Sequence, residues 1–345
     1  MHLPAPRGPL SAHLVDVLAG EVVLDATTVA VARAAAGTSA PLTDDDLHLS
    51  LWMLYELHYR GFDGVDDGWE WEPQLLAVRR ELETVYERAL RTACRKAVDA
   101  GVAVAGPDAD LPEQLFGLVS SFDGPSLAKH LHREATAEQF KEVLVHRSIY
   151  QLKEADPHTW TIPRLPDGPK VALVELQYDE YGAGRAHRQH SHLFAEGMAA
   201  CGLDRTYGAY VDAVPGLTLA LSNAMSLFGL HRRLRGASVG HLAALEATSS
   251  LPCKKYVGGI RRLDLPEEIA EYFDEHVEAD AVHEQVAVRD ICGALVEQQP
   301  ELRTEVLFGA AACLLTDSLL AEHVLTSWQL GLGSLRQPQQ TEAVA

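Results

Sequence analysis

The segment Asp264-Leu-Pro-Glu-Glu-Ile-Ala-Glu-Tyr-Phe-Asp-Glu-His-Val-Glu-Ala-Asp-Ala-Val-His283 predicts a long amphipathic helix. Proline and two glutamates in its first turn are typical of a helix start, and Pro300 bounds its far end. Titratable side chains stand in the middle of its apolar stripe, where apolar residues are expected. The stripe consists of Ile269, Phe273, His276, Asp280, His283 and Ala287. Because a buried, unpaired carboxylate is costly, this face needs charged partners or a cation.

Two interpretations of this stripe remain open from the segment alone. The polar residues could face a wet groove or bulk solvent, which would make them ordinary surface groups. Alternatively, Asp280-Ala-Val-His283 is the carboxylate-x-x-His unit with which helical bundles bind pairs of iron ions. Imidazole and carboxylate without thiolate suit iron, manganese or zinc rather than an iron–sulfur cluster.

Helical periodicity dominates the rest of the chain, and no comparable set of alternating strands is present. We expect helices over 44–59, 72–100, 135–155, 171–202, 217–230, 237–249, 266–297 and 302–330. Glycine and proline predict breaks at 61–68, 101–112, 157–169 and 249–259. The break at 101–112 divides the chain into an N-terminal helical region, 1–110, and a C-terminal helical domain, 111–345. The fold class is therefore all-α.

Composition narrows the partners and the compartment. The chain has 49 acidic residues against 29 basic ones, which disfavours nucleic acid and acidic lipid as partners. Its longest apolar runs are too short for a bilayer span, so we expect no membrane anchor. The five cysteines are scattered and odd in number, which indicates small buried hydrophobes and no disulfide framework. No secretion signal is recognisable, and we expect a cytoplasmic protein.

Two metal ions would need more ligands than one helix offers. Lone carboxylates in apolar surroundings are the natural source, and three occur in the predicted helices: Glu154, Glu180 and Glu246. His190 follows Glu180 ten residues later. Taken singly, each glutamate is more often a surface residue than a ligand.

The ordered set of these residues resembles the ligand pattern of the haem-oxygenase-like diiron oxidases and oxygenases, and within them the iron-containing redox enzymes. The likeness covers about 111–330, with a weaker part at 47–75. It is carried by His146–His158, Asp179–Gly182, Gly229–Gly236, Gly240–Ala243 and Glu275–His283. The resemblance implies a haem-oxygenase-like helical bundle with an additional N-terminal helical region.

The resemblance also implies which residues hold two Fe(II) ions, the second of them labile. Residues matching Glu180, His190 and His276 hold the first iron, and those matching Asp280 and His283 hold the second. The residue matching Glu246 joins or bridges, and the one matching Glu154 binds only in some states. Charge agrees independently, since four carboxylates and three neutral imidazoles balance the four positive charges of two ferrous ions.

Helix geometry predicts one irregularity in this scheme. Ten residues of ideal helix turn through about 1,000°, which leaves Glu180 and His190 about 80° apart around the axis. Gly182 and Gly184 lie between them and can break the helix. We therefore expect a local departure from helical geometry there.

Activation of dioxygen to hydroxylate, desaturate or cleave a small organic, amino-acid-like substrate is the activity that the resemblance implies. Dioxygen and that substrate are the expected partners, and an external electron donor and a homodimer are compatible with it. The alternative keeps the bundle without iron, as a haem-oxygenase-like ligand-binding or thiaminase-like protein. Haem would need only one proximal histidine and leaves the carboxylates unexplained. Thiamine degradation would need a well-placed cysteine nucleophile.

Overall fold

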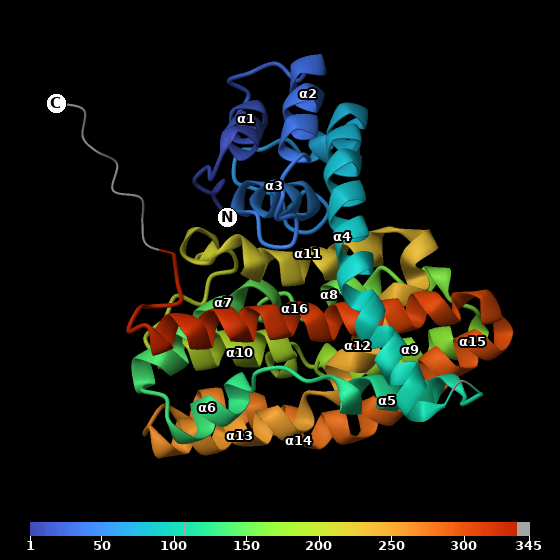
Figure 1. Ribbon diagram of the computed structural model, residues 1–345. Helices are drawn as coiled ribbons and strands as arrows, with labels where there is room; N and C mark the ends of the chain where they lie inside the picture. Colours follow the sequence, from blue (N-terminus) through green and yellow to red (C-terminus); the bar gives the residue numbers. More distant parts are fainter. Residues whose placement is uncertain (107, 337–345) are drawn as a thin grey trace.

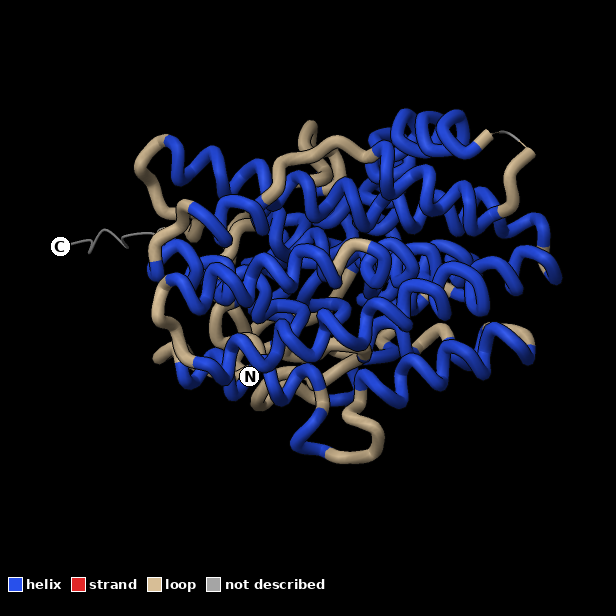
Figure 2. The backbone as a smooth tube through the Cα atoms, turned by 90° about the horizontal axis from the view of Figure 1, so that it is seen from below, coloured by secondary structure: helices blue, strands red, loops and turns tan. Residues whose placement is uncertain are grey.

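The protein is built from helices joined by turns and loops, as Figure 2 shows for the described chain. The computed structural model describes residues 1–106 and 108–336, without the side chains of 278–281. No strand occurs in these described ranges, so the expected all-α class is confirmed. The N-terminal helices are α1 (Pro9–Leu18), α2 (Ala26–Ala35), α3 (Asp45–Glu56) and α4 (Pro73–Ala105).

The remaining helices form the core that carries the site. They are α5 (Leu111–Ser121), α6 (Leu127–Arg133), α7 (Ala137–Gln151), α8 (Asp156–Thr159), α9 (Asp167–Glu180), α10 (His190–Ala200), α11 (Gly216–Leu230), α12 (Arg235–Ala247), α13 (Ser250–Arg262), α14 (Glu267–Gln285), α15 (Ala294–Gln298) and α16 (Arg303–Gln329). A π-helical stretch, η6 (Val286–Gly293), continues α14. Short 3-10 turns are η1 (Asp67–Trp71), η2 (Ile162–Arg164), η3 (Ala186–Arg188), η4 (Val211–Ala213), η5 (Arg232–Leu234) and η7 (Pro300–Leu302).

The N-terminal helices stand on one face of this core, with α3 packed on α11 (Figure 1). The long helix α4 descends from them across α16 and packs against α5. A buried ion pair between Glu56 of α3 and Lys153, in the turn after α7, joins the two parts, and the Tyr207 hydroxyl donates to Glu56 at 2.6 Å. The division at 1–110 and 111–345 stays a prediction.

Glycines allow α12 and α16 to pack in direct backbone contact at the centre of the core. A Cβ added at Gly240 would overlap the carbonyl of Val306, and one at Gly309 would overlap the carbonyl of Ala237. One stretch of α16 with its preceding turn, Pro300–Gln329, is apolar and long enough to cross a membrane, but 61% of its apolar window is buried inside the protein. This is the pattern of a core helix.

The break expected at 249–259 is wrong, because these residues lie almost entirely in α13. Pro252 falls in the first turn of that helix, where its missing N–H costs no hydrogen bond. Gly259 permits a close approach to α6, since a Cβ there would lie 2.5 Å from the carbonyl oxygen of Leu131. The glycine and proline therefore serve a helix start and a helix contact.

Candidate metal centre

Six of the seven side chains expected from the sequence gather inside the core. They come from the turn after α7, the end of α9, the start of α10, the end of α12 and two places in α14. In that order they are Glu154, Glu180, His190, Glu246, and the pair His276 and His283. Their exposed fractions run from 3% for His190 to 9% for Glu154. The seventh, Asp280, lies within 278–281, outside the described side chains.

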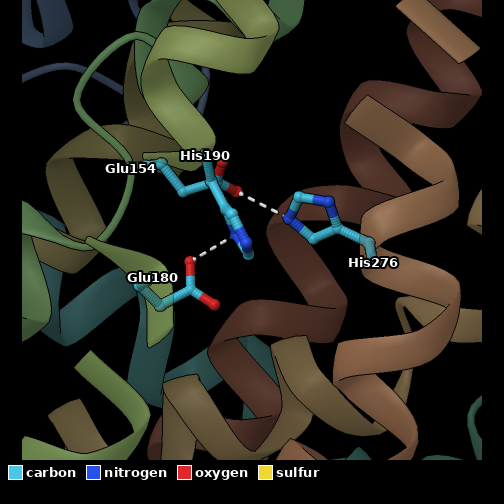
Figure 3. Close-up of side chains that lie close together, drawn as sticks. All are labelled: Glu154, Glu180, His190 and His276. Carbon is cyan, nitrogen blue, oxygen red and sulfur yellow. Dashed lines mark ion pairs between the residues drawn. The ribbon is translucent and has the colours of Figure 1, made fainter. Parts of the chain in front are cut away.

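The first group joins two carboxylates to two imidazoles whose polar ends face one another (Figure 3). One ligand atom from each of Glu154, Glu180, His190 and His276 lies within 4.8 Å of the others. His190 Nδ1 is 2.9 Å from Glu180 Oε2, and His276 Nε2 is 3.6 Å from Glu154 Oε1. Two nitrogen and two oxygen donors at these separations suit one iron, manganese or zinc ion.

The second group consists of Glu180, Glu246 and His283, again within 4.8 Å of one another. His283 Nδ1 is 3.5 Å from Glu180 Oε1 and 3.7 Å from Glu246 Oε2. Glu180 therefore belongs to both groups, with Oε2 beside His190 and Oε1 beside His283. The resemblance gave the joining role to Glu246, whereas here Glu180 is the carboxylate between the groups.

A tight turn between α9 and α10 brings Glu180 and His190 together. The range 171–202, expected as one irregular helix, divides there into two helices, and the expected irregularity is confirmed. Gly182, Ala183 and Gly184 all have positive φ, and a Cβ at Gly182 would lie 2.5 Å from the carbonyl oxygen of Arg185. The turn thus replaces the helical path that would have pointed the two side chains in different directions.

Hydrogen bonds from neighbouring groups orient both histidines of α14. His276 Nδ1 lies 2.7 Å from the carbonyl oxygen of Tyr272, which favours the tautomer that presents Nε2 to the first group. The Tyr272 hydroxyl donates to both oxygens of Glu154, at 3.1 and 2.9 Å. His283 Nε2 is 3.3 Å from Asp179 Oδ2, which leaves Nδ1 toward the second group.

Neither Tyr272 nor Asp179 was predicted to orient a ligand, although Asp179 begins one of the segments that carry the resemblance. Two signals could have found them: Tyr272 stands one helical turn before His276, and Asp179 directly precedes Glu180. The burial expected for the stripe is confirmed in α14 and at the start of η6. The buried residues are Ile269, Phe273, His276, His283 and Ala287, each no more than 7% exposed. The wet-groove interpretation is therefore wrong for these described residues.

The carboxylates and imidazoles of the two groups shift one another's pKa values. Burial favours the neutral form of Glu180, but the imidazoles around it, His190 foremost, lower the pKa of its carboxyl to about 2. Burial raises the pKa of Glu246. Burial alone would lower the pKa of His283, yet Glu246 and Glu180 raise it to about 9. A metal ion bound here would therefore displace a proton from His283.

Two buried nitrogens fit a bound cation. His190 Nδ1 and His283 Nδ1 have no hydrogen-bond partner among the described residues, although carboxylate oxygens lie 2.9 to 3.7 Å away. A nitrogen lone pair facing carboxylate oxygens is repelled unless a proton or a cation lies between them. The donor set, the burial and these unpartnered atoms together suit a pair of metal ions.

Two cavities adjoin the two groups of candidate ligands, one on each side. A small cavity of about 50 Å³ is lined by Glu154, Glu180, Glu246 and His276, among others. A more open cavity of about 400 Å³ on the other side is lined by His190 and His283 and carries charged residues, among them Arg185 and Arg188. The first is large enough for one or a few water molecules or a diatomic gas.

A comparison with protein families agrees with this chemistry. The family model described as "Iron-containing redox enzyme" matches residues 141–318, slightly more than half of the chain. That match includes all seven expected site residues. A solved structure of a CADD-like protein of unknown function from Nostoc punctiforme is similar, with a TM-score of 0.45 and 17% identity over 66% of this chain and 94% of that chain. No protein of curated function matches.

Proposed function

Since the chain belongs to the iron-containing redox enzyme family, we propose that it is a non-haem diiron oxidase or oxygenase that activates dioxygen to oxidise a small organic substrate. Hydroxylation, desaturation and cleavage of an amino-acid-like molecule are the outcomes within this proposal. An external electron donor completes the reaction where the substrate does not supply all the electrons. The five buried free cysteines suit the reducing conditions of the cytoplasm.

One observation carries the proposal: Glu180 belongs to two adjoining groups of buried ligands. A shared carboxylate holds two cations close together, which is the arrangement that helical bundles use for iron pairs. The carboxylates of Glu154, Glu180 and Glu246 are buried. Burying their negative charge is costly without positive charge nearby. Two cations would neutralise that charge.

The protein's own residues prepare the site for this chemistry. Bound ferrous iron supplies electrons for the reduction of dioxygen. The carbonyl of Tyr272 and the carboxylate of Asp179 hold His276 and His283 in orientation. Buried walls limit the water around the groups, and their cavity of about 50 Å³ leaves room for a small molecule such as dioxygen.

Iron stoichiometry in two isosteric variants tests the proposal. After anaerobic loading with Fe(II), we expect about two irons per chain in the wild type. Glu180→Gln removes the carboxylate common to both groups and is expected to leave fewer than one iron. Glu246→Gln affects only the second group and is expected to leave about one. Glu175→Gln, an exposed change on the same helix α9, is the control and should keep the wild-type value.

Dioxygen consumption by the loaded protein is the second measurement. The wild type and Glu175→Gln should consume dioxygen after iron loading, and Glu180→Gln should not. Failure of the wild type to take up iron would contradict the proposal and favour a metal-independent ligand-binding protein. Equal iron loss in the Glu180→Gln and Glu246→Gln variants would contradict the bridging position of Glu180.

A further inference from the structure

A large chamber adjoins the candidate metal centre. Its volume is about 310 Å³, within the range of small-molecule sites. The walls come from α7, α11, α12, α13 and α16, and the segment 122–128 before and at the start of α6 completes them. Most of the side chains in the wall are apolar, such as Leu221, Met225 and Val324. The chamber therefore suits a molecule with an apolar body.

The chamber and the small cavity at the metal groups share part of their walls. The shared residues are Arg147, Tyr150, Gln151, Leu245, Ser249 and Cys253. Glu154, Glu180, Glu246 and His276 lie on the other side of these residues. A molecule in the chamber would thus have one end next to the candidate metal centre.

Arg147 is the charged residue at this junction. Its Nη2 donates to the Tyr256 hydroxyl at 2.8 Å, and its Cζ lies 5.0 Å from the centre of the Tyr256 ring. With the Gln151 amide turned so that its oxygen faces Arg147, Nη1 donates to it at 3.1 Å. No ion pair links Arg147 to a carboxylate of the described residues. Asp317 attracts the guanidinium only from beyond ion-pair distance. An anion bound beside Arg147 would therefore be its first direct charge partner.

The charge pattern of the chamber gives the class of that anion. Among the described residues of the wall, Arg147 is the only Lys or Arg and Asp317 of α16 is the only carboxylate. Asp317 is the more exposed of the two, whereas Arg147 lies at the metal side. The planar guanidinium matches a carboxylate in two parallel hydrogen bonds, and one cation among apolar walls is too little for a phosphate.

We propose that the chamber is the substrate site and that Arg147 binds the carboxylate of a substrate with an apolar body, placing the neighbouring carbon atoms next to the metal groups. This inference rests on the proposed function, because it identifies the chamber with the substrate of that reaction. Arg147 is a specificity-determining residue, and the negative charge of Asp317 competes with a bound carboxylate for it.

Binding of matched probes to the metal-free protein tests this assignment. Hexanoate, hexanol and hexylamine share one carbon skeleton and differ in the charge of the head group. Isothermal titration calorimetry should find hexanoate binding the wild type about tenfold or more tightly than either of the other two, because a hydrogen bond to a charged group contributes to affinity on that order. Inorganic phosphate should not compete with hexanoate.

Three variants separate the role of Arg147 from a general loss of structure. Arg147→Gln should weaken hexanoate binding about 10- to 100-fold, and Arg147→Lys should restore part of it. Asp317→Asn should tighten hexanoate binding, since it removes the opposing negative charge. Arg80→Gln makes the same change of net charge at an exposed position of α4 and should match the wild type. Circular dichroism checks that each variant is folded.

Several results would overturn the assignment. They are equal hexanoate affinity in the wild type and Arg147→Gln, equal affinity for hexanol and hexanoate, or preferential binding of hexylamine or phosphate. Since these measurements need no iron, they fail independently of the proposed function. Arg147-dependent hexanoate binding in a protein that takes up no iron would support the assignment of the chamber as a binding site and contradict the proposed oxidase function. Iron uptake and dioxygen consumption without Arg147-dependent hexanoate binding would support the oxidase function and contradict the assignment of the chamber.

Discussion

Tyr272 links two candidate ligands that come from distant parts of the chain. Its hydroxyl donates to Glu154, its backbone carbonyl receives Nδ1 of His276, and its ring packs 4.5 Å from the ring of His276. One residue therefore fixes a carboxylate from the turn after α7 relative to an imidazole from α14. Loss of a group that orients a metal ligand typically lowers metal affinity about 10- to 100-fold.

Replacing Tyr272 by phenylalanine tests this role. Tyr272→Phe keeps the ring but leaves the buried carboxylate of Glu154 without its donor. We expect Fe(II) affinity to fall about 10- to 100-fold, measured anaerobically against a chromophoric chelator. Tyr86→Phe is the matched control, because it removes a buried hydroxyl that donates to the Ala220 carbonyl and contacts no candidate ligand. An unchanged affinity in Tyr272→Phe would show that Glu154 needs no donor to bind metal.

The packing of α12 on α16 fixes the position of a helix that carries one of the candidate ligands. Glu246 stands near the end of α12, and the position of this helix depends on the backbone contact at Gly240 and Gly309. Helix α14 is held in turn by α10, where a Cβ at Gly197 would lie 2.8 Å from the Cα of Ile269. Close helix contacts of this kind leave little freedom for the ligands to drift.

A pair of glycine substitutions tests the contact between these helices. Gly240→Ala drives a methyl group into the Val306 carbonyl, so we expect a loss of about 1–3 kcal/mol in the free energy of unfolding by urea. Gly168→Ala is the control in the first turn of α9, where the nearest atom to an added Cβ is 3.9 Å away. It should be neutral or stabilising by up to about 1 kcal/mol. Equal stability of the two variants would contradict the importance of the contact.

The molecule as a whole buries several histidines outside the candidate ligand set. Burial lowers the pKa of His48 and His158 to about 4 and that of His146 to about 3, from an ordinary value of 6.5. Each therefore stays neutral in the folded protein at a pH where the unfolded chain would bind a proton. The unfolded state gains protons first as the pH falls, and folding stability declines with it.

Acid sensitivity follows from these buried imidazoles. In urea unfolding of the metal-free protein, the free energy of unfolding should fall as the pH drops from about 6.5 to about 4, before most carboxylates become protonated. His48→Asn removes one of the titrating groups and should reduce the slope, though it also lowers the stability at neutral pH. A midpoint that stays constant over this pH range would contradict the expected protonation states. At alkaline pH a different group matters. Protonated His283 stabilises the fold through Glu246 and Glu180, and this contribution is lost as the pH rises through about 9, the pKa of His283.

The helical class, the stripe of α14 and the set of candidate ligands could be recognised in the sequence. Periodicity is a local property, and a histidine or aspartate in an apolar stripe stands out without knowledge of its neighbours. The resemblance then joined residues from 154 to 283 into one ordered pattern. The break in the helix near Gly182 was also foreseen, because ideal helix geometry could not bring Glu180 and His190 to one point.

Contacts between distant segments could be read only from the folded chain. The position of Glu180 between the two groups depends on how α9, α10, α12 and α14 pack, and no local pattern encodes that packing. The same holds for Arg147 beside the chamber, which in the sequence is one arginine among many. Glycines at 258–259 suggested a break because a glycine that loosens a chain and one that admits a neighbouring helix are identical in sequence. The sequence gives the chemical type of each side chain. Which side chains meet in space depends on how segments far apart in the sequence pack against one another.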